Sequence, residues 1–161
     1  MESGECQLHS LQPIQVPVSG FEQLRHRLKH AVRRRLKYLA NVIRRLVRPK
    51  QMPSTAIGQP AALQPGDRVR VRSRDEIRAT LSDWNRLNGC GFMEEMWEFC
   101  GTEQTVMKKM GRFLDEQDYT LKRVRGNMYL LEGVICNGTV DWGPCDRSCF
   151  FFWREEWLEK L

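Results

Sequence analysis

The segment "PGDRVRVRS" at residues 65–73 decides the fold of the larger part of this chain. A Pro-Gly turn opens it, and Val69 and Val71 then alternate with arginines, the period-two pattern of a strand with one buried face. Ser73 and Glu76 stand three residues apart, which is the spacing of a capping box and predicts a short helix. A strand followed at once by a capped helix indicates a mixed α+β domain.

Further strands and helices are predicted after this opening. The segment "FMEEMWEFC" at 92–100 has apolar residues at helical spacing, so it is predicted to be a helix with its last residue, Cys100, facing inward. The segments "EQTVMKKM", "YTLKRVR" and "MYLLEGVIC" are predicted strands of a meander, separated by the polar turns "DEQD" and "GN". The ending "FFFWREEWLEKL" at 150–161 is predicted to be a short amphipathic helix. Because short antiparallel strands suit a strongly bent sheet, we expect a small SH3-like or related antiparallel barrel or meander.

The N-terminal third is predicted to contain a tail, a helix and a linker. Residues 1–20 lack periodicity and contain two prolines, so we expect a flexible tail. Residues 21–49 repeat an apolar residue every three or four positions, which predicts a basic amphipathic helix that Pro49 ends. Residues 50–62 are rich in Pro, Gly and small residues, which predicts a linker to a Cys-rich α+β domain at 63–161. The apolar stripe of the helix consists of Phe21, Leu24, Leu28, Val32, Leu36, Leu39, Ile43 and Leu46.

The positive charge of the chain is concentrated in this helix. The 26 basic and 20 acidic residues give a net charge of +6. Residues 21–50 hold eleven Lys or Arg and one acid, which gives +10, whereas 1–20 and 51–161 each sum to -2. Such a helix can bind an anionic membrane surface, an acidic protein partner or phosphates. The alternative is a solvated helix that packs its apolar face on its own domain.

A second basic row is predicted on the opening strand. Arg68, Arg70 and Arg72 would project from one face of this strand, toward solvent or a polyanion. The sequence contains neither an RNP motif nor a basic strand interleaved with aromatic residues, so nucleic-acid binding is a secondary hypothesis. Glu94, with its neighbouring acids, is interpreted as the outward polar face of the predicted helix at 92–100.

Three cysteines lie within fourteen residues near the C-terminus, as Cys136, Cys145 and Cys149 in a C-x8-C-x3-C pattern. A thiolate site needs such clustering because all its ligands point at a centre only about 2.3 Å away. The glycines and the proline between these cysteines allow the chain to turn back. A closed tetrahedral site needs a fourth ligand, for which we choose Cys100. Cys90 in the "NGCGF" loop is the competitor.

Thiolate ligands alone fit either structural Zn²⁺ or an iron-sulfur cluster, and their spacing leaves both open. Buried cysteines without a ligand and a redox disulfide pair are the alternatives, since free cysteine is among the most buried residue types. Cys149 is predicted near the start of the final helix, where the helix dipole would favour a thiolate. The histidines are His9, His26 and His30, all far along the chain from this cluster, which counts against a Cys/His nucleophile.

The sequence contains no motif of a conventional enzyme class. A phosphate-binding glycine loop, a zincin motif and a nucleophile elbow are all absent from it. The opening "MESGECQLHS" carries acids where a secretory signal would carry positive charge, so we expect a cytoplasmic protein with reduced thiols. No apolar run approaches the ~20 residues of a transmembrane helix.

The last hundred residues resemble small bacterial proteins that combine an SH3-like barrel opening with a cysteine-rich ending. The resemblance rests on four segments that occur in this order: "PGDRVRVRSRDEI", "FCG", "LEGVICNG" and "FWREEWL". It implies a small SH3-like domain and assigns no activity.

Three functional hypotheses follow from these patterns. The first is a metal- or iron-sulfur-binding accessory module with a four-cysteine site (Cys100, Cys136, Cys145, Cys149), which docks on a partner through the helix at 21–49. The second makes the same cysteines a redox cluster that transfers electrons for an oxidoreductase. The third is a charge-driven nucleic-acid or membrane-surface adaptor in which the cysteines hold a structural zinc ion.

Overall fold

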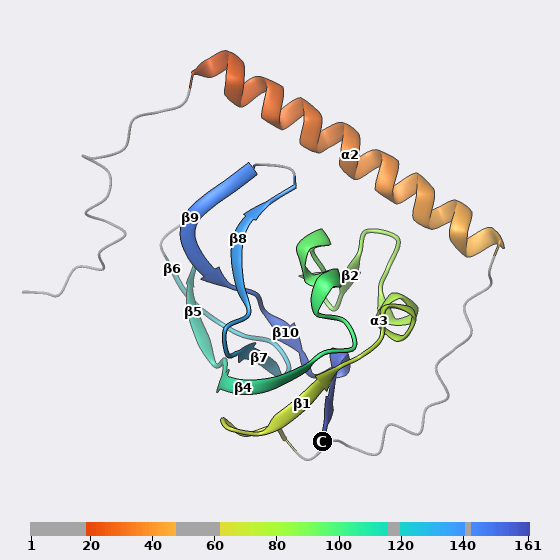
Figure 1. The fold of residues 1–161 in the computed structure, drawn as a ribbon. Helices are drawn as coiled ribbons and strands as arrows, with labels where there is room; N and C mark the ends of the chain where they lie inside the picture. Colours follow the sequence, from red (N-terminus) through yellow and green to blue (C-terminus); the bar gives the residue numbers. More distant parts are fainter. Residues whose placement is uncertain (1–18, 48–61, 116–119, 141–142) are drawn as a thin grey trace, which may run out of the picture.

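The computed structural model describes residues 19–47, 62–115, 120–140 and 143–161. One long N-terminal helix accompanies a set of antiparallel sheets, which confirms the predicted α+β class (Figure 1). Most of the predicted tail at 1–20, most of the predicted linker at 50–62 and the expected helix stop at Pro49 lie outside the described residues.

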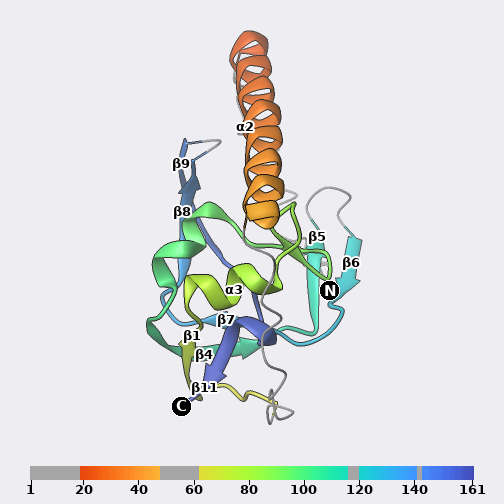
Figure 2. The same cartoon turned by 90° about the vertical axis from the view of Figure 1, so that its right-hand side faces the viewer.

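Helix α2 spans Gly20–Val47, in agreement with the helix predicted from the apolar stripe. The backbone N–H of Glu22 donates a hydrogen bond to the Ser19 hydroxyl at 3.3 Å, which satisfies one of the unpaired donors of the first turn. The carboxylate of Glu22 also suits the positive end of the helix dipole. Figures 1 and 2 show α2 lying along one end of the domain, next to the hairpin formed by β8 (Ile135–Thr139) and β9 (Gly143–Phe150).

A five-stranded antiparallel sheet in the order β10-β7-β4-β1-β11 forms the centre of the domain. Its strands, in chain order, are β1 (Arg68–Val71), β4 (Glu103–Lys109), β7 (Met128–Leu131), β10 (Trp153–Arg154) and β11 (Leu158–Lys160). The order leaves β10 and β11 as the two edges, so the described residues do not form the expected closed barrel. The SH3-like class therefore stays a prediction.

Three two-stranded hairpins surround this sheet. They are β2 (Arg86–Leu87) with β3 (Cys90–Gly91), β5 (Arg112–Asp115) with β6 (Thr120–Arg123), and β8 (Ile135–Thr139) with β9 (Gly143–Phe150). The predicted meander, in which successive strands pair in chain order, was wrong at the second hairpin. Strand β6 pairs with β5 in a separate hairpin, and β4 pairs directly with β7.

The alternation in β1 directs its packing, as the sequence predicted. Val69 and Val71 are fully buried, and β1 is hydrogen-bonded on both sides, to β4 and to β11. Helix α3 (Arg74–Thr80) follows with the predicted capping box. The backbone N–H of Ser73 donates to the Glu76 carboxylate at 2.8 Å, and the N–H of Glu76 donates to the Ser73 hydroxyl at 3.4 Å. The strand and the cap together fix where α3 begins.

Replacing Ser73 with Ala is expected to lower the free energy of unfolding by about 1 kcal/mol, because the cap is lost. Hydrogen bonds from the Ser73 hydroxyl and then from its N–H hold the pKa of Glu76 below its usual value. This stabilisation is complete above the unfolded-state pKa of about 4.3 and is lost as the pH falls through the lowered folded-state pKa. Urea unfolding of both proteins at about pH 7 and about pH 3 should show a smaller difference in acid. If the wild type and Ser73→Ala differ in free energy of unfolding by the same amount at both pH values, the Glu76 carboxylate does not contribute to the cap.

Two segments predicted as α-helices adopt other structures. Residues 92–100 contain a short 3-10 helix, η2 (Glu94–Phe99). The ending at 150–161 consists of β10, a single 3-10 turn η3 (Glu155–Trp157) and β11. This second prediction was wrong because the apolar spacing in the segment also fits two short strands joined by one turn. Pairing of β11 with β1, far away in the sequence, decides between the two structures.

The core lies between the central sheet, α3 and η2, and its largest fully buried side chains are aromatic. Trp153 and Trp157 are fully buried, and the Phe92 ring meets both edge-on, with centroids 6.0 and 5.0 Å away. The indole N–H of Trp157 donates to the Thr80 hydroxyl at 3.1 Å, so this buried donor is satisfied. Of the two tryptophans that were predicted on one helix face, Trp157 thus ties η3 to α3, and Trp153 lies in β10.

Candidate functional site

Helix α2 contacts the domain through its polar face. The Asn41 amide donates hydrogen bonds to the Asp83 carbonyl at 3.0 Å and to the Asn85 side-chain oxygen at 2.9 Å. One turn earlier, the Tyr38 ring stacks on Trp84 with a centroid distance of 4.4 Å. These contacts place the C-terminal half of α2 on the loop between α3 and β2.

Charged contacts continue this interface along α2. The Arg33 guanidinium donates to the Val140 carbonyl at 2.6 Å, and the Lys37 ammonium lies 3.1 Å from the Glu94 carboxylate. The Val140 N–H donates in turn to the Glu95 carboxylate at 2.6 Å. The acids that were interpreted as a solvated polar face of η2 therefore hold the basic helix and the β8–β9 hairpin.

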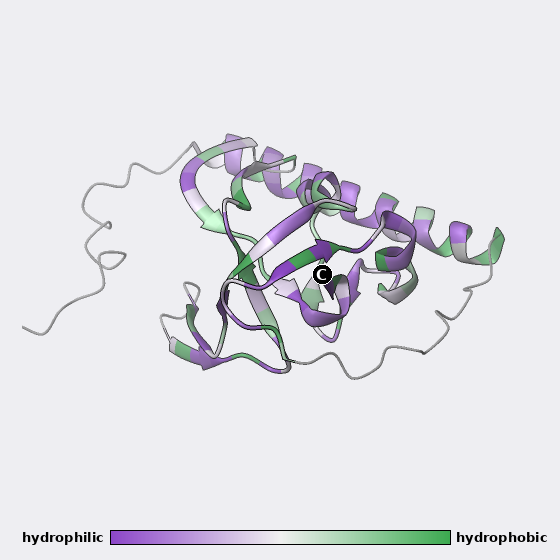
Figure 3. Ribbon diagram, turned by 60° about the horizontal axis from the view of Figure 1, so that its bottom comes forward, coloured by the Kyte–Doolittle hydropathy of each residue, from purple (hydrophilic) through white to green (hydrophobic). Residues whose placement is uncertain are grey.

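The apolar stripe of α2 faces away from the domain. All the contacts above arise from Arg33, Lys37, Tyr38 and Asn41, which share one helix face at spacings of three, four and eight residues. The stripe lies on the opposite face, and the exposed fractions of its eight side chains run from 53 % to 79 %. This contradicts the alternative in which the helix packs its apolar face on its own domain. In Figure 3, hydrophobic residues recur along the whole length of α2 between hydrophilic ones.

Basic side chains accompany the stripe on this outward face. Arg25 precedes Leu28 by three residues and Val32 by seven, so all three share a face of the helix. Arg35 follows Leu28 by seven residues and precedes Leu39 by four, so it lies on this face as well. Both arginines are exposed. The outward surface of α2 therefore combines a continuous apolar stripe with arginines that lie among and beside the apolar side chains.

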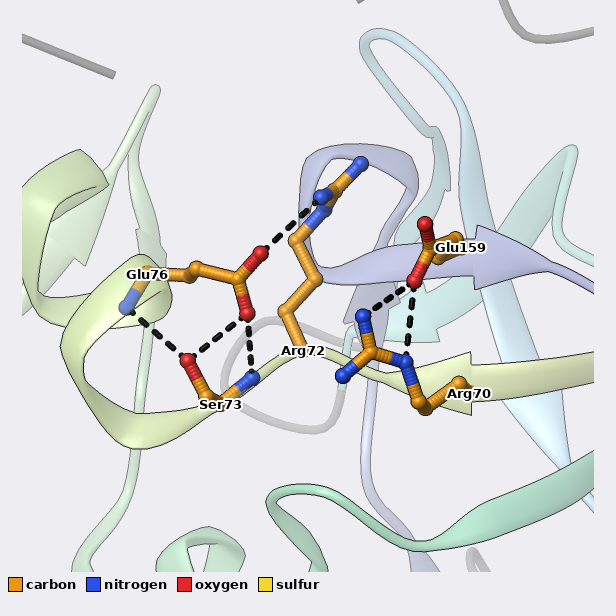
Figure 4. Close-up of polar contacts among 5 residues, drawn as sticks. All are labelled: Arg70, Arg72, Ser73, Glu76 and Glu159. Carbon is orange, nitrogen blue, oxygen red and sulfur yellow. Dashed lines mark hydrogen bonds and ion pairs between the residues drawn. The ribbon is translucent and has the colours of Figure 1, made fainter. Parts of the chain in front are cut away.

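The predicted row of arginines, along β1 and at the residue after it, carries carboxylate partners, and Figure 4 shows the pairs of Arg70 and Arg72. The pairs are Arg68 with Glu103, Arg70 with Glu159, and Arg72 with Glu76. The Nε of Arg70 donates to Glu159 at 2.9 Å, and this hydrogen bond is the main cause that raises the pKa of Arg70. Because each arginine meets an acid from a neighbouring element, this row is a set of ion pairs that ties β1 to its neighbours. It no longer supports the polyanion hypothesis.

The four predicted cysteine ligands lie on the two strands of the β8–β9 hairpin and at the end of η2. Cys136 in β8 is directly opposite Cys149 in β9, and Cys145 lies exposed in the same strand as Cys149. Cys100 follows η2 and packs against the core, as predicted. Within 19–47, 62–115, 120–140 and 143–161, no three His, Cys, Asp or Glu side chains are grouped so that they could hold a metal ion. The zinc or iron-sulfur site stays a prediction.

The surroundings of these cysteines differ from those the sequence suggested. Cys149 lies in a strand and not at a helix start, so the expected dipole effect on its thiol does not apply. Gly138 has a φ of +116°, and a Cβ at this position would run into the Gly143 carbonyl, so glycine is needed where β8 meets β9. Burial raises the pKa values of the competitor Cys90 and of Cys100, which keeps both as neutral thiols near pH 7. Cys6 lies outside the described residues.

Sequence reasoning missed the residues that seat α2. Tyr38 and Asn41 interrupt the run of basic residues on the face opposite the stripe, and this interruption is the signal that could have identified a docking surface. The partners of these two residues lie at 83–85, in a polar loop without periodicity, so nothing local marks them.

A comparison with protein-family models and with curated proteins finds no match for this chain. Among the helices in the described parts of the chain, none has the length and apolar character needed to cross a membrane.

Proposed function

We propose that this protein is an adaptor that binds anionic membrane surfaces through α2 and holds the domain at 63–161 against the opposite face of that helix. One observation carries this proposal. The helix uses its polar face for its own domain and leaves eight large apolar side chains exposed. An exposed apolar stripe with basic residues beside it is the pattern of a helix that lies in a membrane interface.

The energetics of such binding follow from the same side chains. Burial of apolar surface in the boundary between headgroups and acyl chains contributes about 25 cal/mol per Å². Each Lys or Arg held near an anionic leaflet contributes about 1 kcal/mol. Arg25 and Arg35 are long enough to lay their aliphatic stems along the apolar face while their guanidinium groups reach the lipid phosphates. Apolar burial and electrostatic attraction therefore both favour binding through the same face of α2.

Other occupants fit this surface less well. In a helical dimer, Arg25 and Arg35 would enter an interface in which α2 provides no acid besides Glu22. Three consecutive spacings of four residues, from Leu24 to Leu36, also depart from the heptad of a two-stranded coiled coil. A nucleic acid would engage the guanidinium groups and leave the apolar stripe in water. An anionic lipid surface matches both the charge and the apolar area.

Co-sedimentation of the full-length protein with vesicles tests the proposal. We expect strong binding to vesicles that contain about 30 % anionic lipid, and much weaker binding to purely zwitterionic vesicles. Raising the salt concentration should weaken the binding, since it screens the basic side chains. Absence of binding to anionic vesicles at low salt would refute the proposal. Binding to duplex DNA that exceeds vesicle binding would support the nucleic-acid hypothesis in its place.

A further inference from the structure

Cys136 and Cys149 face each other across the β8–β9 hairpin, whose two strands lie side by side in Figure 1. Direct partners in an antiparallel pair project their side chains from the same face. Their Cα atoms are about 4.5–5.5 Å apart, within the range of about 4.4–6.8 Å that a disulfide spans. The two sulfurs can therefore bond without a change of strand register.

The pair is also open to solvent and lies beside an irregular part of the ladder. Cys149 is exposed and Cys136 is partly exposed, so a small reagent can reach them. The register shifts directly after Cys136, where the β9 residues at 145–148 lie between its partner and the next paired position. A bulge of this kind disrupts the ladder locally, which allows the backbone beside the cysteines to adjust.

We propose that Cys136 and Cys149 are a thiol-disulfide exchange site that a small-molecule disulfide, such as oxidised glutathione, converts into a cross-strand disulfide. The exposed Cys149 thiolate attacks one sulfur of oxidised glutathione, forms a mixed disulfide and releases one glutathione. The Cys136 thiolate then attacks the Cys149 sulfur of the mixed disulfide and releases the second glutathione. The two cysteines lose two protons and two electrons in total, and oxidised glutathione gains both. This site does not depend on membrane binding.

The remaining described cysteines lack this combination of features. Cys145 is exposed, but it lies in the irregular part of β9 and has no cysteine as its cross-strand partner. Cys90 and Cys100 are partly buried, and burial raises their pKa values, so less of the reactive thiolate is present. The exchange should therefore select one pair out of the six cysteines of the chain.

Peptide mapping of the full-length protein after incubation with oxidised glutathione tests the assignment. After an acid quench and alkylation, digestion with trypsin and a protease that cuts before Asp separates the three cysteines into peptides 126–140, 141–145 and 148–154. We expect 126–140 to be linked to 148–154, with two of the six cysteines protected from alkylation. A dominant link from 141–145, a link between two chains or glutathione adducts alone would overturn the proposal.

Single substitutions provide the matched controls. Cys136→Ser and Cys149→Ser should each stop at a glutathione adduct on the remaining partner, because no second thiol is available to resolve it. Cys145→Ser changes a cysteine in the same hairpin and should leave the cross-link at its wild-type yield. The wild-type peptide map remains decisive even where a variant folds poorly.

Discussion

Replacing Leu28 and Leu39 together with Asp is expected to lower the affinity for anionic vesicles by roughly a hundredfold or more. Burial of each leucine contributes about 1.5 kcal/mol or more, and about 1.4 kcal/mol corresponds to a factor of ten in affinity. The new carboxylates add repulsion from the anionic surface. Both leucines are more than half exposed in the isolated protein, so its thermal unfolding should change little.

The matched control for this double variant is Leu121→Asp with Leu161→Asp. These leucines are 63 % and 56 % exposed, lie outside α2 and receive the same change in charge. The control should keep most of the vesicle binding, and flotation with anionic vesicles measures both variants. If the two double variants lose binding equally, net charge alone controls the association and the stripe is not the membrane contact.

Trp157→Ala is expected to lower the free energy of unfolding by about 3–5 kcal/mol, the cost of truncating a buried tryptophan. The side chain is fully buried against Phe92, and its N–H is bonded to Thr80. Since whole domains are stable by only about 5–15 kcal/mol, this variant should unfold at much lower urea concentration. Urea titration followed by circular dichroism measures the shift.

Two further variants make the result specific to the position. Trp84→Ala is the matched control, because Trp84 is 47 % exposed and its ring meets only groups of α2, the Tyr38 ring and the Arg34 guanidinium, in the contacts described for it. It should cost about 0.5–1.5 kcal/mol, as for a stacked aromatic pair. Thr80→Val leaves the Trp157 N–H without a partner and should cost about 1–3 kcal/mol. Equal losses for the two tryptophan variants would contradict the placement of Trp157 in the core.

Local sequence signals predicted the elements that depend on neighbouring residues. The strand at Val69 and Val71 follows from strict alternation, and the start of α3 follows from the Ser73 and Glu76 capping box. Helix α2 follows from its long 3.6-residue period. In each case the hydrogen bonds or buried side chains that decide the structure lie within a few residues of one another.

The arrangement of the C-terminal cysteines and the structure of residues 150–161 depend instead on which strands pair with one another. Spacing placed Cys136, Cys145 and Cys149 near one another, but cross-strand register made the first and third partners and left the second apart. Trp153 and Trp157 fit a helical face equally well until β11 paired with β1, about ninety residues earlier. Local patterns in the sequence do not show which distant strands will pair, because that pairing depends on how the whole chain packs.

The amino-acid sequence by itself predicted one basic helix with a continuous apolar stripe at 21–49, which the structure has as α2, since helix period and charge are properties of adjacent residues. Only the tertiary structure decided which side of that helix turns toward the domain. Tyr38 and Asn41 find their partners in the loop around Trp84, more than forty residues away. Those specific ring and hydrogen-bond contacts exist only after the loop has folded, and they leave the apolar side chains facing outward.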